Sequence, residues 1–232
     1  MSTEEPFAVV ILAAGEGSRL GAEVNKVYLD LAGKPLLVHS MTKLSHHPRV
    51  QEMVLVINEK DRSILKRRVL DEFTFPVPLT VALGGDHRQD SSLSGLRKVE
   101  SEYVLIHDGA RPNFSSDLIS RLIRGVVRHQ ASFPGVRPVD TLRRTRNQRG
   151  IETLDRNQVV QVQTPQGFRT DSIREVLEEA VAQQNYLTDD AAALMTYSGV
   201  RPYVVEGQRE NIKVTRRADL ELLRVLMGEV SD

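Results

Sequence analysis

Residues 7–12, FAVVIL, and the stretch that follows, Ala13-Ala14-Gly15-Glu16-Gly17-Ser18-Arg19, decide the fold that we expect for this chain. The six-residue apolar run predicts a β-strand covered on both faces, as in a parallel sheet between two helical layers. Small residues directly after such a strand let backbone N–H groups hold a phosphate chain, because parallel sheets bind ligands at the carboxyl ends of their strands. The stretch therefore predicts an α/β protein with an anion site at that edge. The alternative is a glycine-rich turn that binds nothing.

Short β-branched runs alternate with longer helical patterns along the rest of the chain, which predicts βαβ units. Further strands are expected at residues 53–57, 79–83, 103–106 and 202–206, and helices at residues 35–44, 61–73, 91–99, 115–129, 170–184, 189–198 and 215–227. Ser115 is the expected N-cap of its helix. The pattern predicts a single α/β domain over residues 1–232, with a doubly wound, mainly parallel, Rossmann-like sheet.

The alternation stops between residues 134 and 161, where the turn signal Arg-Asn-Gln-Arg-Gly occupies residues 146–150. We interpret residues 134–161 as a protruding β-hairpin arm. Since an exposed pair of strands is rarely stable alone, we expect the arm to pack on a second copy of the chain in a homodimer. The arm is also rich in arginine: Arg143, Arg144, Arg146, Arg149 and Arg156. These side chains either keep an exposed edge soluble or capture a sugar phosphate, and for the second role we favour Arg156, nearest the return strand.

The composition limits the partners of the chain. Its 31 basic and 31 acidic residues cancel, so there is no overall field for nucleic acid or for an anionic membrane, and we expect neither partner. With no cysteine, disulfides, thiolate zinc sites and a cysteine nucleophile are excluded. The acidic N-terminus and the absence of a long apolar run favour a cytoplasmic protein.

Two further loops carry residues suited to phosphate and base recognition. Asp108 follows the strand at residues 103–106, where its carboxylate could hold Mg²⁺, although Asp-Gly is also a common turn dipeptide. Gly84 and Gly85 permit close backbone approach, here to a base, with Asp86 and Ser91 as hydrogen-bonding groups. The alternative is that Asp90 or Ser91 only caps the following helix.

Cations accompany these loops. Arg19 and Lys26 lie in or just beyond the first loop, and Lys213 precedes the last helix, which suits a triphosphate better than an uncharged ligand. The alternative is a solvated surface loop. The spacing excludes a Walker A loop, because no GxxxxGK[ST] occurs. A dinucleotide fingerprint also fits poorly, because the glycine after Gly15 and Gly17 is Gly21, one place late.

Taken in order, the motifs resemble the 2-C-methyl-D-erythritol 4-phosphate cytidylyltransferase family of the non-mevalonate isoprenoid pathway. The matching stretches cover nearly the whole chain: residues 12–21 (LAAGEGSRLG), 84–91 (GGDHRQDS), 107–112 (HDGARP), 140–142 (DTL), 155–156 (DR), 163–167 (QTPQG), 188–190 (TDD) and 211–215 (NIKVT).

The resemblance implies a nucleotidyltransferase fold, a homodimer clasped by its arms, and a site for CTP, a sugar-alcohol phosphate and Mg²⁺ or another divalent cation. The implied nucleotide-binding residues are Ala13, Ala14, Gly15, Gly17, Gly84, Gly85, Asp86, Arg88 and Ser91. The implied catalytic cations are Arg19, Lys26 and Lys213. The acceptor would meet Asp108, Arg111, Thr141 and Arg156, the last two from the neighbouring subunit. The metal ligands would be Asp108 and Glu210.

The chain departs from the family pattern at a few positions. Asn25-Lys26-Val27 stands where the family usually has Pro-Lys-Gln, Ser92 replaces a valine, and Glu210 replaces an aspartate. We expect the acceptor phosphate to attack the α-phosphorus of CTP in line, releasing pyrophosphate. A sister enzyme for another polyol phosphate, such as ribitol 5-phosphate, and a catalytically silent nucleotide-binding protein are the two alternatives. Release of pyrophosphate from CTP, with each acceptor in turn, separates the three.

Overall fold

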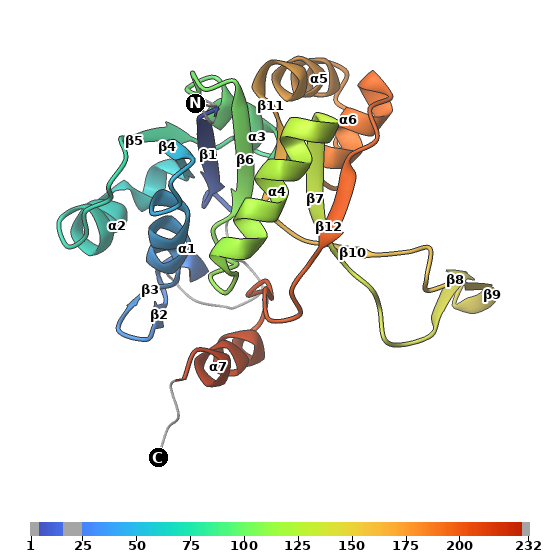
Figure 1. Cartoon of the computed structure of the whole chain (residues 1–232). Helices are drawn as coiled ribbons and strands as arrows, with labels where there is room; N and C mark the ends of the chain where they lie inside the picture. The colour runs from blue at the N-terminus through green and yellow to red at the C-terminus, as the bar shows by residue number, and fades with distance from the viewer. Residues whose placement is uncertain (1–4, 16–24, 229–232) are drawn as a thin grey trace.

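The main sheet of the computed structural model, which describes residues 5–15 and 25–228, has eight strands (Figure 1). They run in the order β10-β7-β11-β6-β1-β4-β5, with β12 paired to β7. Their bounds are β1 (Phe7–Leu12), β4 (Val50–Ile57), β5 (Leu79–Leu83), β6 (Tyr103–Asp108), β7 (Ala131–Val136), β10 (Gln161–Val162), β11 (Gln166–Arg169) and β12 (Tyr203–Glu206). Strands β5, β4, β1 and β6 are parallel, whereas β11 is antiparallel to both of its neighbours. The predicted α/β fold with a mainly parallel sheet is confirmed.

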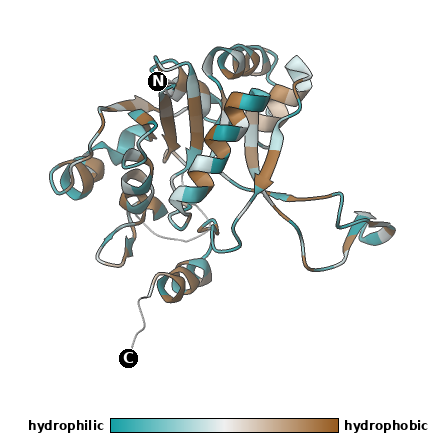
Figure 2. Ribbon diagram, in the orientation of Figure 1, coloured by the Kyte–Doolittle hydropathy of each residue, from teal (hydrophilic) through white to brown (hydrophobic). Residues whose placement is uncertain are grey.

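Helices cover both faces of this sheet, because alternate residues of a strand point to opposite sides. Phe7, Val9 and Ile11 of β1 belong to a core shared with α1 and α4, while Ala8 and Val10 belong to a second core shared with α3, α5 and α6. The strands in the middle of the sheet are accordingly strongly hydrophobic, and α4 turns a polar face outward (Figure 2). The helices are α1 (Leu36–Ser45), α2 (Arg62–Leu65), α3 (Arg88–Leu96), α4 (Ser116–His129), α5 (Thr170–Ala182), α6 (Asp190–Ser198) and α7 (Arg217–Leu226).

The order of the strands places a crevice beside the end of β1. From β1 the chain builds outward through β4 and β5, and then returns to the other side of β1 with β6. Connections that leave in opposite directions open a crevice at the carboxyl ends of two such strands, the usual ligand site of an open α/β sheet. Leu12 and Asp108 are register partners at this point, and the Gly109 N–H donates to the Leu12 carbonyl at 2.9 Å. Two of the predicted site loops therefore start side by side.

Most predicted elements are confirmed, with some shifted ends. Ser115 caps α4, accepting a hydrogen bond from the Leu118 N–H at 3.2 Å. The predicted start of the helix at residue 91 is wrong, because the Asp90 carboxylate accepts the His87 N–H at 2.9 Å and helix α3 begins at Arg88. The predicted helix over residues 61–73 is shorter, with α2 passing into the π-helix η4 (Lys66–Leu70).

The predicted hairpin arm is present as β8 (Leu142–Arg146) and β9 (Arg149–Leu154), which form a sheet of their own. Asn147 and Gln148 turn the chain with φ of 50° and 64°, at the turn signal in the sequence. Both ends of the predicted range lie in the main sheet, however. Pro134 is part of β7, where its carbonyl accepts the Gln163 N–H at 2.8 Å. In Figure 1 the hairpin extends well away from the other elements.

Another two-stranded sheet, β2 (Asp30–Leu31) with β3 (Lys34–Pro35), precedes α1. Across residues 5–15 and 25–228, no helix is long and apolar enough to cross a membrane.

The close packing of α3 on the sheet gives a test of the fold. A Cβ atom at Gly95 would lie 2.5 Å from Val10 Cγ1 and 2.8 Å from Val56 Cγ2. Gly95→Ala should therefore overpack the core and lower the free energy of unfolding by about 1–3 kcal/mol. Gly150→Ala in the arm is the control, since its nearest contact would be Arg143 Cδ at 3.4 Å. Equal midpoints of urea unfolding for the two variants would contradict this packing.

Candidate active site

A cavity of about 480 Å³ opens at the crevice beside β1. Its walls come from the loop after β1, the start of the 3₁₀ turn η2 (Lys26–Tyr28), the β5–α3 loop, the end of β6 and the segment before α7. The lining residues are Leu12, Ala13, Ala14, Gly15, Lys26, Val27, Asn58, Gly85, Asp86, His87, Arg88, Ser91, Asp108, Ala110 and Lys213. Segments far apart in the sequence thus contribute to one concave site.

The glycines of the β5–α3 loop bring it against the first loop. A Cβ atom at Gly84 would lie 2.3 Å from the Cβ of Ala14, so only glycine permits this approach. The Gly85 N–H donates to Ser91 Oγ at 3.3 Å, and the Gly84 N–H donates to the Ile57 carbonyl at 2.8 Å. These contacts leave a narrow, backbone-rich wall that suits a flat ligand group.

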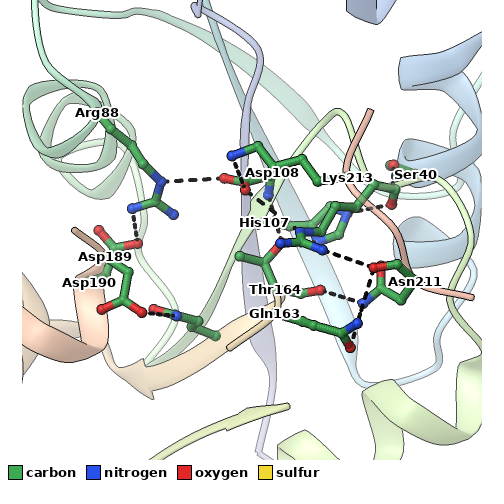
Figure 3. A network of polar contacts seen from close by, with 12 residues as sticks. Ser40, Arg88, His107, Asp108, Gln163, Thr164, Asp189, Asp190, Asn211 and Lys213 are labelled. Atoms are coloured by element: carbon green, nitrogen blue, oxygen red, sulfur yellow. Dashed lines mark hydrogen bonds and ion pairs between the residues drawn. The ribbon is translucent and has the colours of Figure 1, made fainter. Parts of the chain in front are cut away.

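Three cations surround the carboxylate of Asp108, which is 8% exposed at the end of β6 (Figure 3). Lys213 Nζ lies 2.7 Å from Oδ2, Arg88 Nε lies 3.3 Å from Oδ1, and Arg111 Nε lies 3.8 Å from Oδ2. Burial alone raises the pKa of Asp108, but the charges of Arg88 and Lys213 outweigh burial and hold that pKa well below its usual range. The carboxylate is therefore ionised at neutral pH.

Arg88 joins Asp108 to a second buried carboxylate. Its Nη1 lies 2.7 Å from Oδ2 of Asp190, the first residue of α6, which is 0% exposed. Burial lowers the pKa of Arg88, but the two carboxylates raise this pKa by more than burial lowers it, so the guanidinium stays charged. Its Nη2 is buried with no hydrogen-bond partner among the described residues. Arg88 lines the cavity, and a guanidinium group is suited to an anionic oxygen of a ligand.

His107 is connected to Asp108 by hydrogen bonds through Thr164. The ring is fully buried, with Nε2 3.0 Å from the Arg111 carbonyl and Nδ1 3.1 Å from Thr164 Oγ1. Burial lowers the pKa of His107 to about 3, so the ring is neutral. Because a carbonyl only accepts, the proton is on Nε2, and Thr164 donates to Nδ1. Thr164 Oγ1 in turn accepts the Asp108 N–H at 3.1 Å.

A second cavity of about 300 Å³ adjoins the first, and both are lined by Arg88, Asp108 and Lys213. Its other walls are Arg111, Val162, Gln163, Thr164, Gln166, Thr188 and Asp189. Arg111 is held there by a hydrogen bond from Nη1 to the Asn211 carbonyl at 2.9 Å, and the Asn211 amide donates to the Thr164 carbonyl at 2.9 Å. The charged side chains of Arg88, Asp108 and Lys213 therefore border both cavities.

A family model described as 2-C-methyl-D-erythritol 4-phosphate cytidylyltransferase matches residues 7–229. The chain belongs to this family.

Individual members of the family match the chain over almost its whole length. A 2-C-methyl-D-erythritol 4-phosphate cytidylyltransferase of Geobacillus kaustophilus is 36% identical over 223 residues, which are 96% of this chain and 97% of the relative. One of Bacillus velezensis is 35% identical over 222 residues, 95% of each chain. The crystal structure of 4-diphosphocytidyl-2C-methyl-D-erythritol synthase from Anaerococcus prevotii has a TM-score of 0.86 at 26% identity, covering 97% of this chain and 96% of that one.

Most residues expected from the family resemblance meet at the two cavities. The first is lined by Ala13, Ala14, Gly15, Lys26, Gly85, Asp86, Arg88, Ser91, Asp108 and Lys213, and Gly84 packs directly behind it. Arg111 lines the second. Gly17 and Arg19 lie outside the described residues. Glu210 is exposed and is not among the described residues that line either cavity, so we do not carry it into the metal site.

Thr141 and Arg156 are exposed on the arm, where Arg156 Nη1 donates to the Val139 carbonyl at 2.8 Å. Neither residue is among the described residues that line the two cavities of its own chain.

Sequence reasoning missed the residues that hold these side chains in place. Thr164 and Gln163 lie in the QTPQG motif and Asp190 in the TDD motif, and neither motif was assigned a role beyond the family resemblance. Asp189, which precedes Asp190, caps helix α6 by accepting the Ala192 N–H at 2.8 Å. The signal for Asp190 was the second acidic residue, which a cap alone does not require.

The neutral state of His107 predicts a pH dependence of stability. In the unfolded chain a histidine has a pKa of about 6.5. Between that value and the folded pKa of about 3, the unfolded chain binds a proton that the folded protein does not. The free energy of unfolding should therefore fall as the pH drops below 6.5, with a contribution to the slope of up to about 1.4 kcal/mol per pH unit.

His107→Gln should remove this contribution, so its urea-unfolding free energy should change less between pH 7 and pH 4.5 than that of the natural protein. His129→Gln is the control, because His129 is exposed and stacks on Tyr203. A His107→Gln variant with an unchanged slope would show that the buried ring is not the group responsible.

Proposed function

We propose that this chain transfers a cytidylyl group from CTP to the phosphate of 2-C-methyl-D-erythritol 4-phosphate and releases pyrophosphate. The observation that carries the proposal is the pair of adjoining cavities with Arg88, Asp108 and Lys213 at their junction. The larger cavity, with its backbone-rich wall, suits the nucleotide. The smaller cavity, next to Arg111, suits the phosphate of the acceptor.

In this reaction an oxygen of the acceptor phosphate forms a bond to the α-phosphorus of CTP. The bond from the α-phosphorus to the bridging oxygen breaks, and its electron pair leaves with pyrophosphate. A phosphate monoester has a second pKa of about 6 and is largely dianionic at neutral pH, so it needs no general base. This agrees with the site, where the buried histidine uses both ring nitrogens in structural hydrogen bonds.

The side chains act by holding and neutralising phosphate groups. Lys26 stands on the nucleotide side of the junction, and Lys213 lines both cavities. Fixed cations in a partly buried site stabilise the charge that develops on the α-phosphoryl oxygens and on the leaving pyrophosphate. Arg88 also lines both cavities, and its Nη2 has no hydrogen-bond partner among the described residues.

Mg²⁺ is part of the proposal, with Asp108 as the protein ligand and Asp86 as a second carboxylate at the cavity. Within residues 5–15 and 25–228, no three His, Asp or Glu side chains gather into a metal site. One or two carboxylates fit the usual way in which proteins hold this ion, with substrate phosphates as further ligands. When bound, Mg²⁺ would neutralise phosphate charge.

Removing the lysine of the first loop tests the proposed activity. Lys26→Ala should lower kcat/KM for CTP by at least about a hundredfold, because a fixed charge near the developing negative charge is lost. Lys98→Ala, at an exposed lysine after α3, is the matched control. Pyrophosphate release is measured with CTP and either 2-C-methyl-D-erythritol 4-phosphate or ribitol 5-phosphate.

Near-normal turnover of Lys26→Ala would overturn the assigned role of the cavity. A preference for ribitol 5-phosphate would change the acceptor. CTP binding by the natural protein without pyrophosphate release from any acceptor would favour a catalytically silent nucleotide-binding protein.

We also propose a cytoplasmic homodimer in which the arm of each subunit reaches the partner. The support is the isolation of the β8–β9 hairpin, since a two-stranded sheet is marginally stable in water without a partner. Val139, just before the hairpin, and Ile151, on β9, are 58% and 57% exposed. In such a dimer Thr141 and Arg156 would complete the acceptor site of the other subunit.

Ile151→Asp should weaken this association, because it places a charge in the proposed interface. We expect a shift from dimer to monomer in light scattering at micromolar concentration, with an increased KM for the acceptor. Val127→Asp is the control, at a residue of α4 that is 44% exposed and outside the arm. A dimer that persists in Ile151→Asp, or a natural protein that is monomeric, would contradict the arm-mediated interface.

A further inference from the structure

Lys26 enters the cavity directly after a buried asparagine. We propose that this residue, Asn25, is a positioning residue that fixes Lys26 against the nucleotide, acting together with the buried carboxylate of Asp61. The proposal rests on the proposed function, because it assumes that Lys26 binds a phosphate of CTP. It concerns two residues that do not themselves line the described cavity walls.

All the hydrogen-bonding groups of the Asn25 amide are used. Its Nδ2 donates to the Ala13 carbonyl at 2.9 Å and to Asp61 Oδ2 at 2.9 Å, while Oδ1 accepts the Val27 N–H at 3.4 Å. Asn25 and Asp61 are each 6% exposed. Since a buried polar group without a partner costs about 1–3 kcal/mol, one orientation of the amide is strongly preferred.

These bonds join Lys26 to parts of the structure that cannot easily move. Ala13 continues β1, and its N–H donates to the Val56 carbonyl at 2.8 Å. Asp61 ends the 3₁₀ turn η3 (Glu59–Asp61), and its N–H donates at 2.9 Å to the carbonyl of Asn58, a residue of the cavity wall. The side-chain amide of Asn25 thus bonds to the segments that follow two neighbouring parallel strands, β1 and β4. Asn25 directly precedes Lys26, so these bonds also hold the backbone that carries Lys26.

The residues after Lys26 hold it from the other side. Val27 and Tyr28 are 3% and 0% exposed within the hydrophobic core. The Tyr28 N–H also donates to the Asn25 carbonyl at 2.9 Å. With the backbone fixed on both sides, the Cα of Lys26 is held at the edge of the cavity, and the side chain of Lys26 is half-buried there.

The backbone of Asn25 explains why an asparagine can stand where the family pattern usually has proline. Its φ of −57° lies within the range that a proline ring imposes. A proline sets this angle covalently. Here the side-chain hydrogen bonds of Asn25 maintain the same angle. Asp61, which is distant in sequence, accepts one of these bonds and so also contributes to the position of Lys26.

A mutant cycle on CTP affinity, measured by titration calorimetry, tests the proposal. Asn25→Ala should weaken CTP binding about tenfold, because a misplaced binding group loses much of its contribution. In the Lys26→Ala background the same substitution should cause no further loss. Asp61→Ala should act in the same direction and to a smaller extent, and it provides the test if Asn25→Ala does not fold. Asn185→Ala, at an exposed asparagine, is the control.

The outcomes separate this proposal from the one on which it rests. Unchanged CTP affinity in folded Asn25→Ala or Asp61→Ala overturns the positioning role. An equal loss with and without Lys26 also overturns it, because Asn25 would then act on the cavity wall through Ala13. Failure of the natural protein to bind CTP would instead reject the proposed function.

Discussion

The ionised carboxylate of Asp108 among Arg88, Lys213 and Arg111 is the interaction on which the site depends. Each partner comes from a different part of the chain: the start of α3, the segment before α7 and the loop after β6. A buried charge is tolerated only when partners compensate it, so these segments must converge wherever Asp108 is placed. The β6 strand, next to β1, puts it at the crevice of the sheet. The strand order and the need to compensate the buried charge of Asp108 therefore place the site at the same crevice of the sheet.

The network is arranged so that positive charge remains available. Asp108 and Asp190 provide two negative charges, while Arg88, Lys213 and Arg111 provide three positive ones. The cations of this network border both cavities and are suited to phosphate groups, and the cavity walls add Lys26, Asp86 and Asp189 to the charged groups. His107 is held neutral by burial, so it supports the backbone of the loop without adding to the excess. The proposed chemistry needs this separation between groups that carry charge and groups that only hold position.

The sequence predicted well those features that depend on local pattern. The apolar run at residues 7–12, the glycine loops and the turn at Asn147 follow from strand burial, close backbone approach and positive φ, which single residues reveal. It did not predict β7 or β11. β7 contains Pro134 and Gly135, which disfavour strands, and β11 contains Gly167, so both depend on tertiary pairing. Side-chain partners were equally hidden: nothing near Asn25 or Asp190 in the sequence points to Asp61 or Arg88.

The position of β11 has a consequence for how the protein is made. β6 and β7 follow one another in the chain but are not neighbours in the sheet, because β11 lies between them and pairs with both. A nascent chain that has emerged only as far as the arm therefore has a gap in the middle of its sheet. The strand that fills this gap follows Gln163 and Thr164, and Lys213 comes later still. Synthesis must thus be almost finished before the charges around Asp108 can balance, and a chain that ended after the arm would lack Gln163, Thr164 and Lys213 of the second cavity.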